Sequence, residues 1–98
     1  MGHWVRLLSD PDPKLRLAAA GKLGNVGSSD PTVIPALCGA LQDQSADVRC
    51  AAILALVKSG TDANTAVEPL KTLVRLNSDA RVRTYATKAL EKLETQGK

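Results

Sequence analysis

The stretch that decides the fold is QDQSADVRCAAILALVKSG, residues 42–60. Its apolar side chains recur three and four residues apart, which is the spacing of one face of an α-helix. The polar residues Ser45 and Asp47 suit a helix start, and Gly60 suits a left-handed C-cap. The segment therefore predicts one helix with an apolar stripe made of Val48, Ala51, Ala52, Ala55 and Leu56.

The same pattern occurs twice more. SDPDPKLRLAAAGKLGNVG covers residues 9–27, and NSDARVRTYATKALEKL covers residues 77–93. Arg16, Arg49 and Arg83 fall in register, at steps of 33 and then 34 residues. Two further sets follow the same register, Ala19, Ala52 and Ala86 together with Leu23, Leu56 and Leu90. Three coincidences at a near-constant step indicate an internal repeat.

A second helix precedes each of these segments. Asp30 and Pro31 open TVIPALCGALQD as a predicted N-cap and first helical residue, and TAVEPLKTLVRLN is the parallel segment. Before the first repeat only HWVRLLS remains, which has the pattern of the end of a helix. The predicted core positions of these helices are Ile34, Leu37, Cys38 and Leu41, then Val67, Leu70, Leu73 and Val74.

These features predict an all-α fold, a right-handed α-solenoid of about three stacked antiparallel helix pairs, the first one incomplete. We expect one domain over residues 1–98, with repeats at about 3–27, 30–60 and 64–94. A pair this thin cannot bury its apolar face alone, so neighbouring pairs must stack.

Composition and charge reduce the number of function classes that the sequence can support. The net charge of +3 is too mild to indicate nucleic acid, and no apolar run approaches the roughly 20 residues that cross a bilayer. We see no signal peptide at the N-terminus, and Cys38 and Cys50 are expected as free thiols in the cytoplasm. The one histidine, His3, lies at the extreme N-terminus. No nucleophile–base pair, metal cluster or phosphate loop is recognisable, so we expect no enzyme, cofactor or metal.

The repeat resembles the HEAT-repeat superfamily, because D-x-S/D-x-x-V/L-R-x-A-A follows an I/V-x-P-A/L-L helix. Its short period is similar to that of the HEAT-like repeats first associated with phycobilin lyases. The resemblance covers about residues 5–93 and implies a protein-interaction scaffold. It also implies that the chain is the C-terminal part of a longer solenoid, with apolar residues near Trp4 and Leu8 exposed for self-association at the N-terminal end.

The resemblance further implies a ladder of hydrogen bonds between repeats. Its expected rungs are Asp10 with Arg16 and Asp43 with Arg49. In the third repeat Asn77 stands opposite Arg83 and brings no charge, so that rung should be weaker. We favour this structural role for the arginines over ligand binding.

In such solenoids the second helix of each pair lines the concave face. This assigns a partner-binding surface to Leu17, Gly21, Cys50, Leu54, Lys58, Thr84, Tyr85, Lys88 and Lys92. An apolar centre with a charged rim is typical of a surface that binds a protein or peptide. Leu17 and Leu54 could instead pack against the neighbouring repeat, and Tyr85 could anchor a partner or cover the C-terminal end of the core. The alternatives to a scaffold are an accessory domain of a bilin lyase and a nucleic-acid-binding HEAT module.

Overall fold

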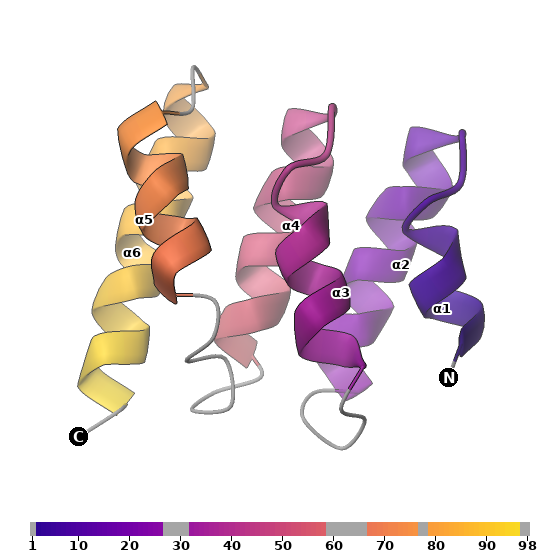
Figure 1. Cartoon of the computed structure of the whole chain (residues 1–98), viewed down its shortest axis with the longest axis horizontal. Helices are drawn as coiled ribbons and strands as arrows, with labels where there is room; N and C mark the ends of the chain where they lie inside the picture. The colour runs from indigo at the N-terminus through magenta and orange to yellow at the C-terminus, as the bar shows by residue number, and fades with distance from the viewer. Residues whose placement is uncertain (1, 27–31, 59–66, 77–78, 97–98) are drawn as a thin grey trace.

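A computed structural model describes residues 2–26, 32–58, 67–76 and 79–96 of the chain, and these parts form helices and turns. The helices follow one another as three antiparallel pairs (Figure 1). Their bounds are α1 Gly2–Leu7, α2 Pro13–Val26, α3 Val33–Ala40, α4 Ala46–Lys58, α5 Val67–Leu76 and α6 Ala80–Gln96. The expected all-α architecture of stacked helix pairs is confirmed.

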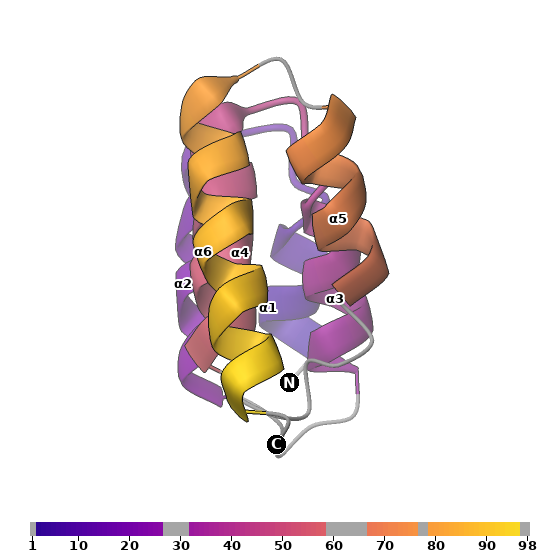
Figure 2. The same ribbon diagram turned by 90° about the vertical axis from the view of Figure 1, so that its left-hand side faces the viewer.

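The helices lie in two layers. Figure 2 shows α2, α4 and α6 side by side in one layer, which we call the B layer, and α1, α3 and α5 in the other, which we call the A layer. Within the B layer α4 packs against both α2 and α6, while α1, α3 and α5 each pack on the B helix of the same pair. The stack measures 32 × 31 × 15 Å, so it is only two helices thick.

Short polar residues start the B helices, at equivalent positions of the repeat. Asp12 Oδ1 accepts a hydrogen bond from Lys14 N at 2.9 Å, just before Pro13 begins α2. Asp79 Oδ1 accepts from Arg81 N at 2.8 Å and from Val82 N at 3.4 Å at the start of α6. Ser45 Oγ takes the same role for α4, at a longer 3.5 Å from Val48 N. These bonds satisfy backbone N–H groups that have no partner inside the helix.

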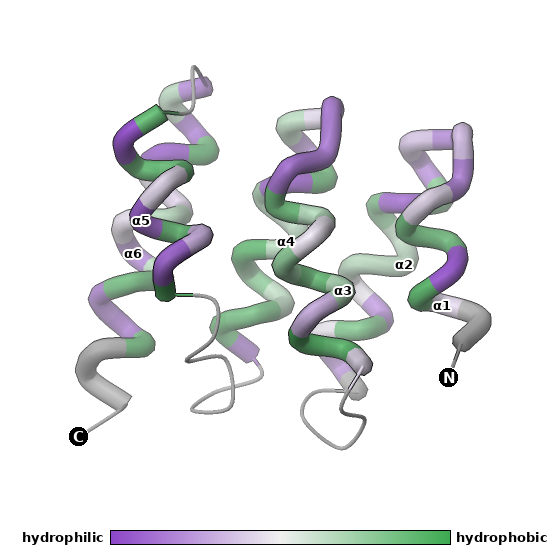
Figure 3. Tube along the Cα trace, viewed as in Figure 1, coloured by the Kyte–Doolittle hydropathy of each residue, from purple (hydrophilic) through white to green (hydrophobic). Residues whose placement is uncertain are grey.

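Aliphatic side chains fill the space between the layers. In α4, Val48, Ala52, Ala55 and Leu56 are buried as the periodicity predicts, whereas Ala51 is only half-buried. Leu90 of α6 is half-buried although it aligns with the buried Leu23 and Leu56. Leu93 is buried instead, because it continues the stripe of buried residues that includes Val82, Ala86 and Ala89. Figure 3 shows that hydrophobic residues dominate the middle pair more than the last.

A glycine brings two B helices unusually close. A Cβ built on Gly24 of α2 would lie 2.9 Å from both Cα and Cβ of Ala55 in α4. That is well inside van der Waals contact, so only glycine permits this approach of the two backbones. The C-cap predicted at Gly60 and the N-cap predicted at Asp30 lie outside the described residues.

Candidate protein-binding surface

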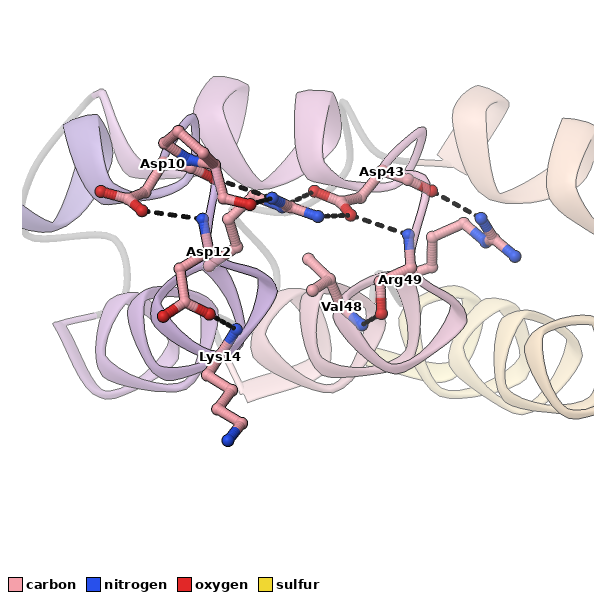
Figure 4. Close-up of polar contacts among 9 residues, drawn as sticks. Asp10, Asp12, Lys14, Asp43, Val48 and Arg49 are labelled. Carbon is pink, nitrogen blue, oxygen red and sulfur yellow. Dashed lines mark hydrogen bonds and ion pairs between the residues drawn. The ribbon is translucent and has the colours of Figure 1, made fainter.

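An arginine links the first two helix pairs. Arg16 Nε donates to Asp43 Oδ2 at 2.8 Å, and Arg16 Nη2 donates to Asp43 Oδ1 at 3.2 Å. The two side chains are only 15% and 9% exposed, so this two-point ion pair is shielded from water. Asp43 Oδ1 also accepts from Ser45 N at 2.9 Å, which fixes the turn between α3 and α4 (Figure 4).

Arg16 and Arg49 each also donate hydrogen bonds to backbone carbonyl oxygens of their own repeat. Arg16 Nη1 donates to the carbonyl oxygens of Asp10, at 2.7 Å, and Pro11, at 3.1 Å. Arg49 Nη1 donates to the carbonyl oxygen of Asp43 (Figure 4). The sequence led us to expect side-chain pairs of Asp10 with Arg16 and of Asp43 with Arg49. The structure differs, because the Asp43 carboxylate is held by the arginine of the preceding repeat.

The corresponding link between the second and third repeats involves one residue outside the described part of the chain. The register that relates Arg16 to Asp43 assigns Asn77 to Arg49, and Asn77 lies outside the described residues. Within the described part of the chain, Arg49 Nε is buried and has no hydrogen-bond partner. The expected pairing of Asn77 with Arg83 therefore stays a prediction.

The predicted partner-binding residues all lie on the B layer. Leu17 and Gly21 come from α2, Cys50, Leu54 and Lys58 from α4, and the other four from α6. All are exposed except Cys50, which is half-buried. Leu17 is 39% and Leu54 is 49% exposed, so neither is used up by packing against the neighbouring repeat. Thr84 donates a local hydrogen bond to the carbonyl oxygen of Ala80 at 3.0 Å, whereas Lys58 reaches α2 and donates to Asn25 Oδ1 at 3.2 Å.

Four of these residues come together around a hollow between α4 and α6. It has a volume of about 200 Å³ and is lined by Ile53, Leu54, Val57, Tyr85, Lys88, Ala89 and Lys92. Tyr85 is 39% exposed and lines this hollow together with residues of α4. Leu17, Gly21, Cys50, Lys58 and Thr84 belong to the same layer but do not line the hollow.

Ile53, Val57 and Ala89 line this hollow, and the sequence did not single them out for binding. They carry no polar group, and helical periodicity places them with the core. A signal existed in the repeat register, because Val57 stands where the first repeat has Gly24. A larger residue at that position holds the neighbouring helix away and leaves space above the core.

The two cysteines are half-buried free thiols. Burial raises the pKa of the Cys38 thiol. Burial also raises the pKa of Cys50, against a smaller opposing effect of the nearby Arg81 guanidinium. Both thiols therefore stay protonated at neutral pH and are poor nucleophiles.

Two classes of site are not found in the described part of the chain. His, Cys, Asp and Glu side chains do not gather there in groups of three that could hold a metal ion. None of the described helices is long and apolar enough to cross a membrane.

The comparison with protein families agrees with this architecture. A family model for HEAT repeats matches residues 3–91. The chain belongs to the HEAT-repeat family. The match does not separate the short phycobilin-lyase-type HEAT repeats from other members. We found no match among curated proteins.

Proposed function

We propose that this HEAT-repeat chain is a non-catalytic interaction module that binds a protein or peptide on the outer surface of its B layer. HEAT repeats are commonly protein-interaction scaffolds. The observation that carries the proposal is the apolar hollow between α4 and α6, with Leu54 and Tyr85 exposed beside it and lysines at its edge. Binding surfaces combine such an apolar centre with a polar rim. The free cysteines favour a reducing compartment such as the cytoplasm.

Pull-down with matched variants tests this role. We would compare the chain with a variant that carries Leu54→Glu, Lys58→Glu and Lys88→Glu. The control carries Lys71→Glu, Arg75→Glu and Leu76→Glu on α5, which likewise changes two exposed cations and one exposed leucine. A partner kept by the control and lost by the B-layer variant supports the proposal, provided that circular dichroism shows both variants folded. Equal retention by all three chains contradicts it.

A second candidate role is self-association, and one residue favours it. Leu15 aligns with Val48 and Val82, which are completely buried, but Leu15 itself is 42% exposed. Two further apolar residues of the first helix pair, Trp4 and Leu8, are half-buried. We infer that a second copy of the chain covers this end face.

The opposite end of the stack decides the geometry of such a dimer. Positions that are apolar in α4, Ile53 and Val57, are replaced in α6 by the exposed Thr87 and Glu91. Helix α6 therefore presents polar side chains at these two positions, and we expect two equivalent N-terminal faces to pair about a twofold axis. Sedimentation over a concentration series should show a dimer that Leu15→Glu abolishes and Leu76→Glu keeps. A monomer at all concentrations would exclude this role.

A further inference from the structure

The size of the hollow between α4 and α6 limits what it can take. Its volume of about 200 Å³ is below the roughly 300–1,000 Å³ of typical small-molecule sites. It is lined by the apolar side chains of Ile53, Val57 and Ala89 and by the exposed residues Leu54 and Tyr85. A space of this size and polarity suits one or two apolar side chains of a peptide.

Repeat divergence explains why the hollow lies here. Between α2 and α4, Gly24 lets the backbones meet at Ala55 and no room is left. The equivalent residue between α4 and α6 is Val57, and Ile53 replaces Ala20. These larger side chains separate the helices at this junction. This substitution distinguishes the second junction from the first.

The charges around the hollow are positive. Lys88 and Lys92 line it, whereas Lys58 of α4 does not, because its ammonium donates to Asn25 Oδ1 of α2 at 3.2 Å. Asp47 on the B layer is 3.5 Å from Arg81, at the opposite end of these helices. Glu91 is exposed on α6 but does not line the hollow. A segment lying across the hollow therefore meets lysine ammonium groups.

We propose that the hollow binds an acidic peptide segment, with one leucine-sized side chain in the hollow and flanking Asp or Glu carboxylates beside Lys88 and Lys92. This inference rests on the proposed function and names the chemistry of the partner. The buried side chain supplies most of the affinity, while the exposed lysines select for charge and raise the association rate. Single-stranded nucleic acid fits less well, because Tyr85 is the one aromatic residue that lines this apolar site and strands need several stacking platforms.

Fluorescence anisotropy with labelled synthetic peptides tests the inference. The probe is a helical peptide with one central Leu flanked by Glu, and two others carry Leu→Ala or every Glu→Lys. We expect the acidic Leu peptide to bind, the Ala peptide to bind about tenfold more weakly and the Lys peptide not to bind. The double variant Lys88→Glu, Lys92→Glu should weaken the Leu peptide by about tenfold or more, whereas Lys71→Glu should not.

Leu54→Ala shows whether the leucine enters this hollow. This variant lacks one side chain that lines the hollow, so the Leu peptide loses a contact that the Ala peptide never makes. The ratio of the two affinities should therefore shrink. Circular dichroism and a thermal melt confirm that each variant is folded. An undiminished difference in Leu54→Ala, or equal binding of the Glu and Lys peptides, overturns the proposal.

Two further outcomes separate the acidic-peptide proposal from the broader proposal that the chain is an interaction module. If the B-layer variant loses its partner in the pull-down but the acidic peptide never binds, the interaction role stands and the acidic partner is wrong. If a labelled oligonucleotide displaces the peptide, and its affinity depends on Lys88 and Lys92 with a steep salt dependence, the surface is a nucleic-acid site and the peptide proposal falls.

Discussion

At the scale of single residues, Arg16 makes four side-chain hydrogen bonds within the described part of the chain, and two of them join the first two helix pairs. It binds the carboxylate of Asp43 at two points and two carbonyl oxygens of its own turn. Arg16→Ala leaves the mostly buried Asp43 carboxylate without its cation, so we expect a loss of about 1–3 kcal/mol in the free energy of unfolding. Urea denaturation followed by circular dichroism measures it.

Arg49→Ala is the matched comparison. It removes a bond to the Asp43 carbonyl oxygen but leaves the Asp43 carboxylate paired with Arg16. The loss of stability should therefore be smaller than for Arg16→Ala. An equal or larger loss would mean that the link between the first two pairs does not depend on the Arg16–Asp43 ion pair.

Asp79 makes the stability of α6 depend on pH. The backbone N–H of Arg81 donates to its carboxylate at 2.8 Å and lowers the pKa of Asp79. A lowered pKa in the folded state stabilises the fold above the ordinary pKa of Asp, about 4, and this contribution is lost as pH falls through the lowered value. Asp79→Asn keeps an acceptor that does not titrate. We expect the melting temperature of the wild type to fall relative to this variant below about pH 4. Parallel melting curves would contradict the assignment.

The sequence predicted which residues form the ladder better than it predicted their partners. The pairing of Asp43 with Arg49 was implied by the resemblance to HEAT repeats. The long side chain of Arg16 instead reaches the carboxylate of the next repeat while it holds its own backbone. Such a contact depends on how far apart two repeats stack, and residue spacing within one repeat does not contain that distance.

At the scale of the helices, two glycines in α2 should respond oppositely to the same change. Gly24→Ala would place a Cβ 2.9 Å from Ala55 and push α2 from α4, which we expect to destabilise the fold by about 1–3 kcal/mol. A Cβ on Gly21 meets nothing within 4 Å, so Gly21→Ala should stabilise the fold by about 0.5–1 kcal/mol through helix propensity alone. Thermal melts of the two variants measure both effects. Stabilisation by both would show that the close approach of the helices is not required.

Helix positions followed from the sequence because local chemistry sets them. Asp12, Ser45 and Asp79 accept bonds from the first turns, and the alternation of Ala with Leu and Val fixes the buried side. The hollow could not be predicted in the same way. It depends on the different spacing of α2, α4 and α6, which small differences between repeats such as Gly24 and Val57 produce.

At the scale of the whole molecule, the two ends of the stack differ in polarity. Leu15 of α2 exposes an aliphatic side chain at one end, while α6 at the other end exposes the polar residues Thr87 and Glu91, and Leu76 is exposed on α5. Polar residues on an outer face keep a solenoid end from stacking further. The binding surface between α4 and α6 lies on the side of the polar end, so association through the Leu15 face would leave that surface open.

The stacked arrangement also predicts how stability is distributed. In a solenoid each pair is stabilised by its own contacts and those with its neighbours. Helix α4 packs against α2, α3 and α6, and Val48, Ala52, Ile53 and Leu56 within it are completely buried. Helix α1 packs against α2, and its described side chains are at most partly buried. Native-state hydrogen exchange should therefore be slowest in α4 and fastest in α1.

Gly24→Ala should speed exchange in α2 and α4 more than in α6, because it strains their junction. Uniform protection in the wild type, with a uniform change in the variant, would instead mean that the three pairs unfold as one cooperative unit.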